Sequence, residues 1–101
     1  MNIIWSDFAS KMLLDIFEYY KKEASISVVR KIKNQLFLAT KILSTQPGLG
    51  QKELNLLNLK EDHRYLITGN FKIIYKRVKE GVLITDVFHT SQNPEKLITR
   101  R

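Results

Sequence analysis

The chain has 101 residues, of which 44% are hydrophobic and 27% charged, a composition typical of a globular protein rather than a disordered one. Four glycines and two prolines exclude fibrous and low-complexity classes, and the length predicts a single domain over residues 1–101. The sequence contains no cysteine, which excludes a disulfide scaffold, a cysteine zinc site and a thiol nucleophile.

Positive charge dominates, with 17 Lys and Arg against 10 Asp and Glu, for a formal net charge of +7. The excess lies in the middle and C-terminal parts, which favours nucleic acid or an acidic protein as partner; simple solubility is the alternative. The longest apolar run, 36–39, is far too short for a membrane span, and the N-terminus lacks the pattern of a signal peptide. We therefore expect a cytoplasmic protein that does not associate with membranes.

The first half predicts a strand followed by two helices. Asn2–Trp5 is a β-branched and aromatic run, and Ser6 or Asp7 can cap a helix after it. That helix has an apolar stripe at three- and four-residue spacing, made by Phe8, Met12, Leu13, Ile16, Phe17 and Tyr20. A second helix starts near Ser25 or Ser27, with a stripe of Val29, Ile32, Leu36, Ala39 and Leu43. The short connection between them predicts an antiparallel helical hairpin.

The second half predicts an antiparallel meander. Pro47, Gly48 and Gly50 end the second helix, and 51–60 is either a short strand or an irregular arm. Strands are expected at Arg64–Thr68, Phe71–Val78 and 82–89, with turns at Gly69-Asn70 and Glu80-Gly81. Pro94 fits the first turn of a short C-terminal helix.

These turns predict which side chains share a face of the sheet, because opposed residues point the same way. They place Lys72 opposite His89. The face expected under the helices holds Leu66, Phe71, Ile73, Tyr75, Ile84 and Phe88. The open face is expected to hold His63, Tyr65, Ile67, Lys72, Ile74, Lys76, Thr85, Val87 and His89.

Residues 62–78, with Arg64, Gly69-Asn70, Phe71, Lys72 and Tyr75 at their characteristic places, resemble the strand pair of RelE/ParE-superfamily toxins. Residues 86–97 resemble the last strand and the start of the tail in that family. The resemblance implies an α+β fold with an N-terminal strand, an antiparallel helical hairpin on a mainly antiparallel β-sheet, and a short C-terminal helix. This order agrees with the one read from the residues.

The resemblance also implies the toxin of a bacterial type II toxin–antitoxin pair, neutralised by a cognate antitoxin in a hetero-oligomer. Such modules act in plasmid stabilisation. RelE-like members cleave mRNA on the ribosome, whereas ParE-like members inhibit DNA gyrase. A third alternative is a degenerate, non-toxic module that only binds an antitoxin. The basic charge fits an acidic segment of the antitoxin or, in some branches, RNA.

Cleavage of RNA by its 2′-hydroxyl needs a base, cations for the phosphorane and an acid for the leaving oxygen. In the RelE-like hypothesis, Lys72 stabilises the phosphorane and His89 acts as the acid or base, with Tyr65 as a further catalytic candidate. The chain departs from the ribonuclease pattern, because His63 and Tyr65 stand where some members have lysines. Ser91 and Gln92 also stand where an Arg is usual. These departures favour the ParE-like branch slightly.

The candidate residues for binding nucleic acid or a partner are Arg30, Lys33, His63, Arg64, Lys76 and Arg77. For each of these residues a solvated or structural role is the alternative; Arg64, for example, could anchor Asp86. Two histidines 26 positions apart do not make a metal site, so no metal and no cofactor are expected.

Overall fold

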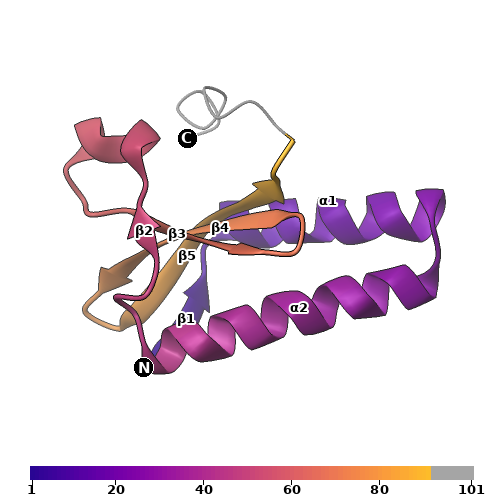
Figure 1. The fold of residues 1–101 in the computed structure, drawn as a ribbon, viewed down its shortest axis with the longest axis horizontal. Helices are drawn as coiled ribbons and strands as arrows, with labels where there is room; N and C mark the ends of the chain where they lie inside the picture. Colours follow the sequence, from indigo (N-terminus) through magenta and orange to yellow (C-terminus); the bar gives the residue numbers. More distant parts are fainter. Residues whose placement is uncertain (92–101) are drawn as a thin grey trace.

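A computed structural model describes residues 1–91 as two helices and one sheet. The elements, shown in Figure 1, are β1 (Asn2–Trp5), α1 (Asp7–Glu23), α2 (Ile26–Thr45), β2 (Gln51–Lys52), the 3₁₀ helix η1 (Leu54–Leu59), β3 (Arg64–Thr68), β4 (Phe71–Val78) and β5 (Gly81–His89). The strand order is β1-β5-β4-β3-β2, with β1 parallel to β5 and the other neighbours antiparallel. The predicted α+β fold is confirmed.

Both helices begin at serine caps. The hydroxyl of Ser6 accepts a hydrogen bond from Ala9 N at 3.0 Å, and that of Ser25 accepts one from Val28 N at 3.2 Å. Each cap satisfies a backbone N–H that has no partner within its helix. The two helices lie antiparallel, and their connected end projects beyond the β3–β4 turn (Figure 1). The predicted hairpin is confirmed.

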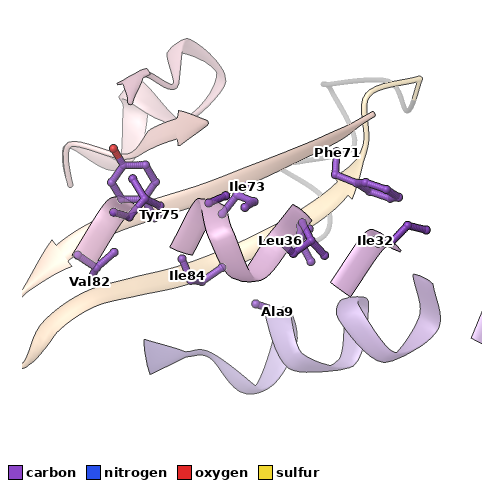
Figure 2. Close-up of a cluster of buried hydrophobic side chains, with 11 residues drawn as sticks. Ala9, Ile32, Leu36, Phe71, Ile73, Tyr75, Val82 and Ile84 are labelled. Atoms are coloured by element: carbon purple, nitrogen blue, oxygen red, sulfur yellow. The ribbon is translucent and has the colours of Figure 1, made fainter. Parts of the chain in front are cut away.

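The main core lies between this hairpin and one face of the sheet. Figure 2 shows Ala9 of α1 and Ile32 and Leu36 of α2 beside side chains from β4 and β5. The buried cluster consists of Ala9, Ile32, Leu36, Ala39, Leu43, Phe71, Ile73, Tyr75, Val82, Ile84 and Val87. The stripe of α2 is almost completely buried, whereas α1 buries Ala9 fully and Met12, Leu13, Ile16, Phe17 and Tyr20 only in part. α1 is therefore the margin of the core.

The β4–β5 register differs from the prediction in two places. Val78 pairs with Gly81, so the turn is Lys79-Glu80 and not Glu80-Gly81. The pairs nearest the turn are therefore shifted by two residues from the prediction, and their side chains still point to the predicted sides of the sheet. A bulge opposite the Ile74/Tyr75 step then removes Thr85 from the pairing, because Tyr75 pairs with Ile84 and Ile74 with Asp86. One extra residue reverses the direction of every side chain beyond it.

Residues 86–89 consequently point to the faces opposite to those predicted. Lys72 pairs with Phe88 and not with His89, whose partner is Phe71. Phe88 packs on the sheet face away from the helices, whereas Val87 belongs to the main core. Lys72 and His89 therefore lie on opposite faces of the sheet, and their predicted pairing is wrong.

The short helix predicted after Pro94 lies outside the described residues. Within residues 1–91, no helix combines the length and the apolar character needed to cross a membrane.

Candidate functional site

An arm, residues 51–62, covers part of the sheet face that points away from the helices, which we call the outer face. The arm starts as β2, which pairs with β3 through Gln51↔Tyr65 and Lys52↔Arg64. It continues as η1, where Leu56 is 2% exposed and forms a second small core with Ile74 and Phe88. The outer face was predicted to be open, and it is instead partly closed by this segment.

A buried ion pair joins the arm to the centre of the outer face. The ammonium of Lys72 lies 2.6 Å from Glu53 Oε2, and the two side chains are 16% and 2% exposed. The other carboxylate oxygen, Oε1, accepts hydrogen bonds from N and Nδ2 of Asn55 at 3.1 and 2.9 Å. The ammonium also lies 4.2 Å from the centroid of the Tyr65 ring, a favourable cation–π contact.

The neighbours of Glu53 determine its protonation. Burial alone raises the pKa of this carboxyl group, but the hydrogen bonds from Lys72 and Asn55 outweigh burial and leave the pKa below its ordinary value. Glu53 is therefore ionised at neutral pH and holds Lys72 as its counterion. Lys72 is thus engaged within the protein at the position where the ribonuclease reading needs a cation for phosphate.

Two further cations of the sheet, Lys76 and Arg64, contact the arm near its ends. Lys76 Nζ lies 2.7 Å from Glu61 Oε1, and Arg64 Nε lies 3.6 Å from Asp62 Oδ2. Arg64 also donates a hydrogen bond to Gly50 O at 2.9 Å. Arg64 pairs with Tyr75 on the helix side of the sheet, whereas Asp86 pairs with Ile74 on the outer side, so the backbone register does not favour the alternative in which Arg64 anchors Asp86.

Tyr75 fixes the loop that leads into the arm. Its hydroxyl donates to Pro47 O at 2.9 Å and accepts from Gly50 N at 2.8 Å. A Cβ atom at Gly50 would collide with this hydroxyl and with Tyr65 O, so a residue with a side chain does not fit there. Burial is the main cause that raises the pKa of Tyr75, and the phenol stays protonated at neutral pH. Tyr75 is a structural residue, as its predicted place on the helix-covered face indicates.

His89 lies in a separate groove, of about 550 Å3, between α1 and the end of β5. Its ring makes an edge contact with Phe71, with the centroids 5.7 Å apart, and its Nδ1 accepts a hydrogen bond from Ser91 N at 3.1 Å. The walls are mostly apolar and include Met12, Ile16, Tyr19, Tyr20, Phe71 and Val87. This groove is suited to apolar side chains of a binding partner.

Residues 3–94 match the family model described as ParE toxin of type II toxin-antitoxin system, parDE. The chain belongs to this ParE toxin family. A comparison with curated protein sequences gives no significant match. Membership in the family implies a cognate antitoxin as partner, in agreement with the resemblance seen in residues 62–78 and 86–97.

In this ParE-family toxin, the predicted site residues do not converge on one site. Arg30 and Arg77 are exposed on α2 and β4, His63 is 3% exposed beside the arm, and the Lys33 ammonium lies 5.1 Å from the Phe17 ring. Lys72 and Tyr65 share the outer face, and His89 lies in the groove on the helix side. The catalytic roles assigned to these three residues stay predictions. In residues 1–91, no three acidic or histidine side chains come together in a group that could hold a metal ion.

Sequence reasoning missed Glu53 and Glu61. A signal was available, because the arm contains the acids Glu53, Glu61 and Asp62 and the neighbouring strands contain Arg64, Lys72 and Lys76. Opposite charges in two segments that are expected to lie together predict ion pairs. Such pairs reduce the positive charge that the strands leave free for a partner.

Proposed function

We propose that this toxin arrests bacterial growth by binding an essential protein, with DNA gyrase as the first candidate, and that its cognate antitoxin neutralises it. In this proposal the pair acts in plasmid stabilisation within the cytoplasm. The observation that carries the proposal is the buried Lys72–Glu53 pair. Lys72 is the cation that a ribonuclease would need to stabilise a phosphorane, and here its ammonium is bound to Glu53.

Ribonuclease chemistry requires its acid, base and cation to reach the same phosphate group. Lys72 is bound to Glu53, Lys76 is bound to Glu61, and the hydroxyl of Tyr65 donates to Gln51 Oε1 at 3.0 Å. His89 lies on the other side of the sheet. Inhibition by binding needs no such set of groups, and this difference favours the ParE-like mode of action.

The groove beside His89 is our candidate site for the antitoxin. Its apolar walls would bury hydrophobic side chains of an antitoxin segment, and acidic residues on that segment would be attracted by the toxin's net charge of +7. The proposal therefore includes a toxin–antitoxin hetero-oligomer.

The test is a supercoiling assay with purified gyrase, relaxed plasmid and the purified toxin. It includes a variant in which the ion pair is replaced as a unit, Lys72→Met with Glu53→Gln, since replacing both partners leaves no buried charge without a counterion. We expect both proteins to inhibit supercoiling to within about twofold, because the pair is structural.

Two other outcomes identify the rival functions. Cleavage of a translated mRNA by the wild-type toxin, lost in the paired variant with its fold intact, would establish a ribosome-dependent endonuclease. A toxin that affects neither gyrase nor mRNA, and leaves growth normal, would be a module that only binds an antitoxin. Either result would overturn the proposal.

A further inference from the structure

The side of α2 that points away from the sheet exposes an unusual combination of side chains. Three large apolar residues lie there, with exposed fractions of 65% for Phe37, 58% for Leu38 and 44% for Ile42. They share this side, which we call the exposed face of α2, with Arg30, Lys31, Asn34, Lys41 and Thr45. The face extends about 22 Å along the helix, from 15 steps of 1.5 Å.

Apolar and cationic side chains alternate on this face, and α2 contains no acidic residue. Leu38 and Ile42 are four residues apart and therefore adjacent, while Phe37 lies beside Lys41. Isolated exposed apolar residues are common on protein surfaces, but here the adjacent pair Leu38 and Ile42 and the separate Phe37 share one side of the helix with cations and no acid, a combination that suits a docking surface. Phe37 is the natural anchor because it offers the largest apolar side chain.

The charges decide which partner fits. A second copy of the chain would bring Arg30, Lys31 and Lys41 against the same cations, in a protein whose net charge is +7. Nucleic acid would satisfy the cations but would leave Phe37 and Leu38 facing phosphates. An amphipathic protein segment with acidic residues beside its apolar stripe satisfies both kinds of side chain.

We propose that the exposed face of α2 is the surface through which this toxin binds the protein whose inhibition arrests growth, and that it docks an acidic amphipathic segment of that protein. The inference rests on the proposed function and assigns its target contact to α2. The groove at His89 and the outer face of the sheet take no part in that contact.

The first test removes the apolar anchor. The variant Phe37→Ser with Leu38→Ser is compared with the control Leu49→Ser with Leu54→Ser, which alters leucines that are 50% and 71% exposed in the loop and the arm. Growth after a short pulse of induction is one readout, and binding of the purified proteins to immobilised DNA gyrase is the other. We expect the α2 variant to lose growth arrest and to bind gyrase at least about tenfold more weakly, whereas the control behaves like the wild type.

The second test separates local charge from overall charge. The variant Lys31→Glu with Lys41→Glu and the control Lys21→Glu with Lys22→Glu change the net charge equally, and all four lysines are exposed. If α2 docks an acidic segment, only the first variant loses growth arrest. An equal loss in both would mean that the overall charge matters and the face does not, and the inference would be wrong.

The outcomes distinguish this inference from the proposed function. If the wild-type toxin neither arrests growth nor binds gyrase, both fail. If it arrests growth and every folded variant does so equally, only the assignment to α2 fails. If the α2 variants lose binding to a DNA duplex and keep growth arrest, the face is a nucleic-acid surface and the inference is overturned. Thermal melting shows that each variant is folded.

Discussion

At the scale of single residues, the main feature is Lys72. The resemblance to ribonuclease toxins gives this lysine a catalytic role, whereas in the structure it forms an ion pair with the buried Glu53. A buried carboxylate is costly unless a cation and hydrogen bonds compensate for the lost water. Glu53 has both, from Lys72 and from Asn55. The same lysine would have to release Glu53 before it could bind a phosphate.

Lys72→Ala should destabilise the protein strongly, because it leaves the carboxylate of Glu53 buried without its counterion. We expect a loss of about 3 kcal/mol in the free energy of unfolding, measured by urea denaturation. The paired variant, Lys72→Met with Glu53→Gln, should lose clearly less. A loss that is equal or larger in the paired variant would show that the ion pair is not the cause.

Acid should weaken the arm's attachment. Since the folded protein lowers the pKa of Glu53, its ionisation contributes stability that is complete above the ordinary pKa of the carboxyl group. That contribution is lost as the pH falls through the lowered pKa, because the unfolded chain then binds the proton more readily. The wild type should therefore lose stability relative to the paired variant as the pH falls from 7 to 3, and a constant difference in unfolding free energy would contradict this assignment.

At the scale of elements, the sequence predicts helices and strands well and register less well. Caps at Ser6 and Ser25, together with apolar stripes, are local signals, and both helices follow them. The bulge that omits Thr85 leaves no such local mark, yet it reverses residues 86–89 and separates His89 from Lys72. The arm was also ambiguous, because its structure depends on ion pairs with strands that follow it in the chain.

The two sides of α2 should respond differently to truncation. Leu36 is 3% exposed within the main core, so Leu36→Ala should cost about 2–5 kcal/mol. Leu38 is 58% exposed, so Leu38→Ala should change the stability by no more than about 0.5 kcal/mol. Urea denaturation of the two variants compares them directly. Similar losses would mean that Leu38 is packed and that the exposed face of α2 is not a free surface.

At the scale of the whole molecule, the positive charge is unevenly paired. Lys72 and Lys76 on the outer face are paired with Glu53 and Glu61, and Arg64 on the other side of the sheet is paired with Asp62, so much of this positive charge is neutralised within the chain. α2 has no acid of its own and keeps its cations exposed. Net charge alone predicted an acidic partner or nucleic acid, and only the three-dimensional pairing indicates which surface is free to meet that partner.

The most direct measurement is a short pulse of this toxin in growing bacteria, with primer extension on a translated reporter mRNA and with the topology of a plasmid from the same culture. We predict growth arrest, intact mRNA and a plasmid that has lost negative supercoiling. Cuts in the mRNA at codon positions, absent when the paired variant Lys72→Met with Glu53→Gln is induced, would contradict the account, because Lys72 would then act on RNA and not only on Glu53.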